Sequence, residues 1–80
     1  MNPRITEVKP QENFTLKLKF TDNSFRTFDM KPYLNYPVFE PLKEKELFDN
    51  ASVFLGSVKW NDEIDMSPDT LFLESELVEQ

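Results

Sequence analysis

The segment Asn13 to Thr21, NFTLKLKFT, alternates strictly between apolar and polar side chains. Its apolar members are Phe14, Leu16, Leu18 and Phe20. A period of two places successive side chains on opposite faces of a β-strand, with one face buried and the other solvated. The segment therefore predicts a half-buried strand of an antiparallel sheet.

The sequence on either side predicts two neighbouring strands. ITEVKP (residues 5–10) precedes the alternating segment, and SFRTFDM (residues 24–30) follows it. Asp22 and Asn23 lie between the second and third strands, and both residue types tolerate positive φ. We therefore expect a three-strand meander whose second connection is a two-residue hairpin turn.

This turn has a consequence for the strand register. A two-residue turn pairs Lys19 with Arg26, which leaves Phe28 on the lysine face. A β-bulge near Thr27 would return Phe28 and Met30 to the core. We expect this bulge, because burying a further aromatic ring outweighs the loss of one ladder hydrogen bond.

The middle of the chain is richer in proline and has a helical rhythm. Residues 31–34 predict a short helical turn opened by Pro32, and residues 42–48 predict a short helix. Residues 51–60 are strand-like, and Gly56 is expected to divide them into two pieces.

The segment WNDEIDMSPDTLF predicts a joint between a strand and a helix. Trp60 is expected to anchor it to the core, with a short strand over residues 63–66. Ser67 is the predicted N-cap of the following helix, Pro68 its first residue, and Asp69 lies near the positive end of the helix dipole.

Four carboxylates crowd this joint: Asp62, Glu63, Asp65 and Asp69. As a metal site they would offer oxygen ligands to Mg²⁺ or Ca²⁺, but their spacing does not fit a calcium-binding loop. A strand would also place Glu63 and Asp65 together on one face and split the set. We therefore favour a structural role, with Asp65 accepting backbone hydrogen bonds near the strand end.

Together these segments predict one α+β domain over residues 1–80. Its small antiparallel sheet consists of the meander and one or two later strands, with two or three short helices. Residues 75–80 form a tail that either extends the last helix or frays. In a helix, Leu73, Leu77 and Val78 would be surplus apolar surface, so this tail is a candidate contact with a partner or with a second copy.

Composition excludes several functional classes. The chain has no histidine and no cysteine, so it lacks the commonest acid–base group and any thiolate nucleophile. Its net charge is −6: residues 1–40 carry net +1 and residues 41–80 net −7. This balance disfavours direct binding to nucleic acid. No segment approaches the length of a membrane span, which favours a cytoplasmic protein.

Two further groups are candidates for contact with a partner. Lys17, Lys19 and Arg26 would form a basic face on the hairpin, although exposed lysines also protect strands against unwanted pairing. The aromatic residues Tyr33, Tyr36 and Phe39 are expected to lie mostly in the core, with one or two exposed.

The chain contains the motifs L.L.F.D, R.FD, VF.PL and V.W....DM.PDTL. With these motifs it resembles, from about Ile5 to Glu74, a small bacterial family known as domain of unknown function 2442. This chain has Asp22-Asn23 where the family usually has Asp-Gly, and WNDE where it commonly has WPNG. The resemblance implies a compact α+β domain. Some relatives are fused to a helix-turn-helix domain, and others neighbour small genes in arrangements like toxin–antitoxin pairs.

The sequence therefore favours a non-catalytic protein–protein interaction module, such as an accessory or antitoxin-like partner, and it implies no enzyme activity or cofactor. One alternative is a ligand-sensing or regulatory domain linked to transcription. Another is a metal-dependent hydrolase that uses Asp62, Asp65 and Asp69.

Overall fold

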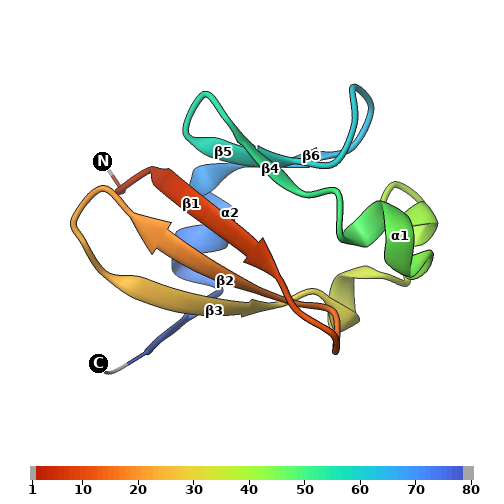
Figure 1. Ribbon diagram of the computed structural model, residues 1–80, viewed down its shortest axis with the longest axis horizontal. Helices are drawn as coiled ribbons and strands as arrows, with labels where there is room; N and C mark the ends of the chain where they lie inside the picture. Colours follow the sequence, from red (N-terminus) through yellow and green to blue (C-terminus); the bar gives the residue numbers. More distant parts are fainter. Residues whose placement is uncertain (1, 79–80) are drawn as a thin grey trace.

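The computed structural model describes residues 2–78, and its main sheet has four antiparallel strands (Figure 1). The strands are β1 (Ile5–Pro10), β2 (Thr15–Phe20), β3 (Phe25–Asp29) and β7 (Glu76–Leu77), in that spatial order. The predicted meander is therefore confirmed. Its central strand β2 carries the alternating segment, with its leucines and Phe20 fully buried.

The β2–β3 connection is a three-residue loop and not the predicted two-residue turn. The amide of Asn23 donates to the carbonyl of Phe20 at 2.9 Å, and the Phe20 amide donates to the carbonyl of Ser24 at 3.0 Å. Asn23 has a φ of 67°, in the left-handed region. A type I turn followed by a left-handed residue is a common three-residue hairpin, and asparagine tolerates that last position.

The extra loop residue shifts the register by one. Leu16 is paired with Phe28 and Lys17 with Thr27 in an unbroken ladder, so the expected bulge near Thr27 is wrong. Phe28 and Met30 are nonetheless fully buried, because the extra loop residue turns their side chains to the core, as the bulge was expected to do. The main sheet has a register shift in β1 instead, between Ile5 and Glu7.

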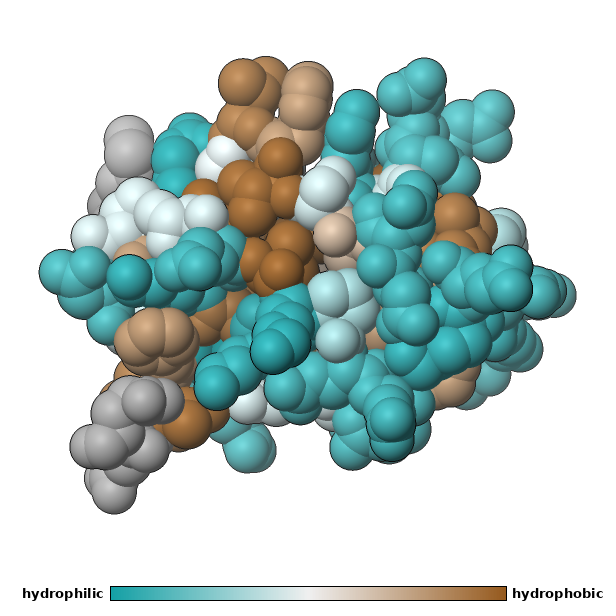
Figure 2. Space-filling view, viewed as in Figure 1, coloured by the Kyte–Doolittle hydropathy of each residue, from teal (hydrophilic) through white to brown (hydrophobic). Residues whose placement is uncertain are grey.

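A second, three-stranded antiparallel sheet holds β4 (Ser52–Phe54), β5 (Ser57–Lys59) and β6 (Asp65–Met66). The predicted division of residues 51–60 at Gly56 is confirmed, since Leu55 and Gly56 form the tip of the β4–β5 hairpin. Figure 2 shows that hydrophobic surface gathers over this hairpin. The α+β class is confirmed, although three of the four later strands form this separate sheet rather than extending the meander.

The helical segments are short. They comprise two 3₁₀ turns, η1 (Lys31–Tyr33) and η2 (Glu40–Lys43), and two α-helices, α1 (Lys45–Phe48) and α2 (Pro68–Leu73). The helix expected over residues 42–48 is divided, because Glu44 has a ψ of 111° and is extended. Within residues 2–78 none of the helices has the length and apolar character needed to cross a membrane.

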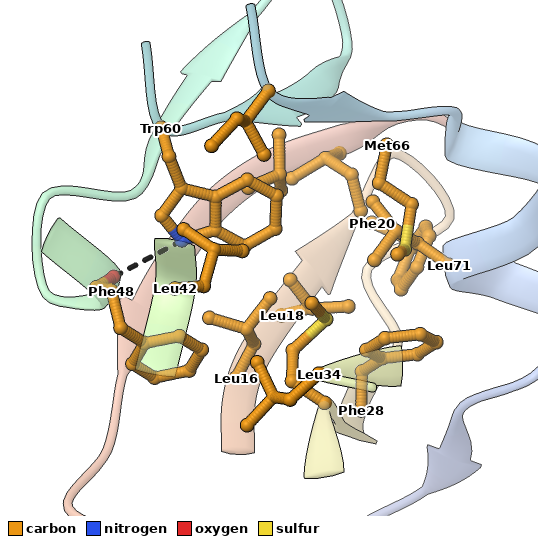
Figure 3. Packing of buried hydrophobic residues seen from close by; sticks show 14 residues of the cluster. Leu16, Leu18, Phe20, Phe28, Leu34, Leu42, Phe48, Trp60, Met66 and Leu71 are labelled. Carbon is orange, nitrogen blue, oxygen red and sulfur yellow. Dashed lines mark hydrogen bonds between the residues drawn. The ribbon is translucent and has the colours of Figure 1, made fainter. Parts of the chain in front are cut away.

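The core lies between the main sheet, the second sheet and the helices. Figure 1 shows α2 behind the main sheet, and Figure 3 shows side chains from both sheets and from α2 meeting in one cluster. Leu16, Leu18 and Phe20 of β2 form one side of it, and Met66 and Leu71 approach from the other. Burial of this cluster is the main stabilising term for a chain without disulfides.

The segment after α2 returns to the main sheet as a strand. Leu77 is paired with Arg26 and Glu76 with Thr27, and the Val78 amide donates to the carbonyl of Phe25 at 2.8 Å. One of the two sequence alternatives extended α2 through the tail. The structure contradicts it, because residues 76–77 form a strand. The remaining two residues of the predicted tail, 79–80, lie outside the described part of the chain.

Candidate interaction surfaces

Trp60 anchors the joint between the second sheet and α2, as predicted. Its side chain is only 2 % exposed and stacks on Phe48, with ring centroids 6.4 Å apart. The indole Nε1 donates a hydrogen bond to the carbonyl of Phe48 at 3.1 Å, drawn as a dashed line in Figure 3. A buried indole N–H needs such a partner, so this bond fixes the orientation of the ring.

Asn61, which the sequence analysis did not single out, organises the turn after Trp60. Its side-chain Oδ1 accepts hydrogen bonds from the amides of Glu63 at 2.8 Å and Ile64 at 2.9 Å. Asparagine favours this local arrangement because its side-chain oxygen reaches the amide two residues on. The backbone-binding role expected for Asp65 is therefore wrong: its side chain is exposed and accepts no hydrogen bond within residues 2–78.

The start of α2 agrees with the sequence prediction. The Ser67 Oγ accepts a hydrogen bond from the Thr70 amide at 3.2 Å, and Pro68 is the first helical residue. Asp69 lies in the first turn and accepts a hydrogen bond from Asn2 Nδ2 at 3.3 Å. These contacts satisfy the helix start and give Asp69 a structural environment.

The four carboxylates of the joint do not converge. Asp62 points into solvent and lies 3.5 Å from Lys59 Nζ, while Glu63, Asp65 and Asp69 are exposed on successive elements. Among residues 2–78 no three acidic side chains gather closely enough to hold a metal ion. The structure therefore does not bring together the residues that the metal-dependent hydrolase alternative requires.

The predicted basic face is divided between the two faces of the main sheet, which corrects that prediction. Arg26 is paired with the buried Leu18, so it points to the same side as the core, whereas Lys17 and Lys19 point to the outer face. The guanidinium carbon of Arg26 lies 4.1 Å from the ring centroid of Phe72 on α2. The one-residue register shift in the hairpin is the cause of this reversal.

The outer face of the main sheet instead gathers three lysines around a shallow hollow of about 310 Å³. We call it the outer hollow; its lining residues are Glu7, Val8, Lys9, Lys17, Leu18, Lys19 and Phe25. Sequence reasoning included Lys17 and Lys19 but missed Lys9 and Phe25. The strand register would have revealed both, because β1 and β3 flank β2 on either side.

The charges around the outer hollow are unevenly paired. Lys19 Nζ lies 3.6 Å from a carboxylate oxygen of Glu7, its cross-strand partner, and 5.6 Å from the ring centroid of Phe25. Lys9 and Lys17 are also cross-strand partners, and neither forms an ion pair within residues 2–78. Like charges placed directly opposite each other in a ladder are destabilising.

The aromatic candidates form a chain of ring contacts that leads outward from the core. Tyr33 lies 5.2 Å from Phe28 and 5.9 Å from Tyr36, between ring centroids, and its edge also meets Phe39. Burial raises the pKa of Tyr33, and the nearby Glu74 carboxylate raises it further. Tyr36 is exposed, in line with the expectation that one or two of the set are exposed, whereas Tyr33 and Phe39 are half-buried and pack against the core rather than within it.

The β4–β5 hairpin presents three consecutive apolar side chains to solvent. Val53 is 38 % exposed, Phe54 47 % and Leu55 79 %. We call these three residues the apolar hairpin. β1 packs beside β4 of the apolar hairpin. Val8 of β1 is the cross-strand partner of the buried Leu18 and packs against the core, so its side chain lies on the opposite face of the sheet from the lysines of the outer hollow.

The backbone at the hairpin tip is in an unfavourable conformation for leucine. Leu55 has a φ of 51° and Gly56 a φ of 82°. Two-residue hairpin turns of this kind strongly prefer Asn-Gly, because left-handed backbone costs an ordinary residue about 1–2 kcal/mol. Sequence reasoning predicted the division at Gly56 but did not single out Leu55.

The tail residues are only partly in solvent. Leu73 at the end of α2 and Leu77 in β7 are exposed, while Val78 is half-buried. The surplus apolar surface predicted for a helical tail is thus reduced by the pairing of β7 with β3.

These features define a small α+β domain that exposes an apolar hairpin and a lysine-lined hollow. The chain belongs to the family described as protein of unknown function (DUF2442), which it matches over residues 5–76. The family resemblance drawn from the sequence is therefore confirmed. No curated protein and no solved structure matches the chain.

Proposed function

We propose that this chain is a non-catalytic protein–protein interaction module and that the apolar hairpin is its main contact with the partner. The observation that carries the proposal is Leu55. This residue is the most exposed large apolar side chain of the described chain and has a left-handed backbone.

Neither feature of Leu55 helps the isolated chain to fold. An exposed leucine gains little from burial, and its backbone conformation is costly. Residues held in unfavourable backbone conformations cluster at active sites and ligand clamps. Contiguous exposed apolar residues in a soluble domain are a further mark of an interaction site.

The rigidity of the hairpin supports this role. The Ile5 amide donates to the carbonyl of Gly56 at 2.8 Å, and Arg4 Nη1 donates to the carbonyl of Leu55 at 3.3 Å. The Lys59 ammonium lies 4.3 Å from the ring centroid of Phe54 and holds that ring in place. A preorganised apolar tip loses less conformational entropy when it docks.

The test is capture of partners from cells of the source species by the full chain, with a zero-length cross-linker and identification by mass spectrometry. Wild-type protein is compared with Leu55→Asn, which removes the apolar side chain and suits the turn. Leu73→Asn is the matched control, because Leu73 is also exposed but lies on α2, away from the hairpin.

We expect one protein to be captured by the wild type and by Leu73→Asn, and to be lost with Leu55→Asn. If the wild type captures nothing specific, or if Leu55→Asn captures the same protein equally well, the proposal is wrong.

A further inference from the structure

We infer that the outer hollow receives a short acidic segment of the partner protein. This inference rests on the proposed function, and it adds the chemistry by which the partner is recognised. It is carried by the two facing lysines, by the lining that Phe25 and the lysine stems give the hollow, and by the position of β1 beside β4 of the apolar hairpin.

The first argument is electrostatic. Lys9 and Lys17 face each other across β1 and β2 without an ion pair in the described chain, although the protein carries an excess of six negative charges. With so many carboxylates present, a like-charge pair left without one is unfavourable for folding. An acidic side chain of a partner placed between the two ammonium groups would remove the repulsion.

The second argument is the position of the lysines in the sheet. Lysine on an edge strand is commonly explained as protection against pairing with another chain. That explanation suits Lys9, since β1 is an edge strand of the main sheet. It does not suit Lys17 and Lys19, because β2 is a central strand with both of its edges already paired.

The third argument is the shape and lining of the hollow. About 310 Å³ accommodates one or two side chains of a peptide and is near the lower limit for small-molecule sites. Phe25 and the aliphatic stems of the lysines supply apolar surface beneath the ammonium groups, whereas the side chains of Val8 and Leu18 point to the core. This combination fits an apolar side chain flanked by carboxylates.

Long polyanions fit the same surface poorly. The outer hollow is basic, but residues 41–80 carry net −7. The molecule measures only 31 × 23 × 18 Å, and charges interact over about 8–10 Å at moderate salt. A nucleic acid or an extended anionic membrane would therefore meet the acidic half as well, whereas a short acidic segment is confined to the hollow.

The position of the hollow also fits the proposed function. β1 contributes Lys9 to the hollow and packs beside β4 of the apolar hairpin. A partner that docks on the apolar hairpin and extends across β1 would reach Lys9 and Lys17. The acidic segment provides specificity and the apolar hairpin provides affinity.

The hollow is tested independently of the natural partner. The probe is a short synthetic peptide with one central leucine flanked on both sides by glutamates, titrated into the ¹⁵N-labelled full chain. The matched control peptide has glutamine in place of glutamate. We expect chemical-shift changes at Lys9, Lys17 and Phe25 with the first peptide only, and binding that weakens as salt is raised.

Two variants separate binding from folding. In Lys9→Gln/Lys17→Gln the affinity for the acidic peptide should fall roughly tenfold or more, since two charge-assisted contacts are lost. Folding should be retained, because the substitution removes a repulsion. Lys43→Gln also removes one exposed lysine, but on η2, and should bind the peptide like the wild type.

The inference is wrong if the acidic peptide leaves the amides of the hollow unchanged, or if the double variant binds it with unchanged affinity. It is also wrong if a single-stranded oligonucleotide or vesicles containing phosphatidylserine bind the hollow more tightly than the peptide does. Partner capture by Lys9→Gln/Lys17→Gln at the wild-type level would contradict this inference and leave the proposed function intact. Failure of the wild-type protein to capture any partner would contradict the proposed function, not the binding of the acidic peptide.

Discussion

The guanidinium of Arg26 lies over the ring of Phe72, with its central carbon 4.1 Å from the ring centroid. This contact joins β3 to α2 and places a charged side chain on the core side of the main sheet. The Arg26 Nε is buried and has no hydrogen-bond partner within residues 2–78. The attraction between the cation and the ring therefore offsets part of the cost of burying that donor.

This arrangement predicts that Arg26→Ala destabilises the domain by about 1–2 kcal/mol, through loss of packing over Phe72 and of the cation–π contact. Lys17→Ala is the control, because it changes the same charge on the outer face, and it should alter stability by no more than about 0.5 kcal/mol. Urea unfolding followed by Trp60 fluorescence measures both. Equal effects of the two substitutions would show that Arg26 behaves as a surface residue.

The same residue shows where sequence reasoning succeeded and where it failed. The alternation in β2 is a local pattern, and it correctly predicted the buried face of that strand and the meander. The pairing of β2 with β3 depends on the length of the loop between them, and a loop of three residues in place of two moved Arg26 to the opposite face. One residue of uncertainty in a turn is therefore enough to rearrange a predicted surface.

The elements whose position depends on residues distant in the sequence were harder to predict. β6 and β7 have two residues each, too few for any periodicity, and their pairing is decided by the elements they reach. The helix start at Ser67 was predictable because capping depends on adjacent residues. Asn61 was not predicted, although an asparagine that follows a strand is itself a turn signal.

The turn after Trp60 gives the second prediction. Asn61→Ala should destabilise the domain by about 1–2 kcal/mol, because two backbone amides, those of Glu63 and Ile64, lose their acceptor. Asp65→Asn should change stability by no more than about 0.5 kcal/mol, since Asp65 is exposed. Thermal unfolding measures both, and about 1 kcal/mol corresponds to a shift of roughly 4–8 °C in Tm for a domain of this size. A larger effect at Asp65 than at Asn61 would restore the structural role first expected of that carboxylate.

The β2–β3 loop gives a pH-dependent prediction. The hydroxyl of Ser24 donates a hydrogen bond to Asp22 Oδ1 at 2.6 Å, its amide donates one at 2.9 Å, and these bonds lower the pKa of Asp22 below 3.8. A lowered folded-state pKa contributes stability that is present above pH 3.8 and is lost as the pH falls through the folded-state pKa. Asp22→Asn should therefore be less stable than wild type near neutral pH, and the difference should shrink in acid.

The control for this prediction is Ser24→Ala, which removes the hydroxyl that makes the largest contribution to the shift and keeps the carboxylate. Its pKa at Asp22, followed by NMR titration of the side-chain carboxyl carbon, should move back toward 3.8. A pKa of Asp22 that is the same in wild type and in Ser24→Ala would contradict the assigned cause.

The last prediction concerns the conflict between stability and binding at the hairpin tip. Leu55→Asn should stabilise the isolated domain by about 1 kcal/mol, because it creates the Asn-Gly pair that left-handed hairpin turns prefer. Gly56→Ala should have the opposite effect, since the new Cβ would lie 2.9 Å from Arg4 Cδ at a φ of 82°. Chemical denaturation of both variants measures the two changes. If Leu55→Asn instead destabilises the domain, the leucine contributes to folding, and its exposure no longer argues for a partner. A gain in stability combined with lost partner capture is the result that only an interaction site explains.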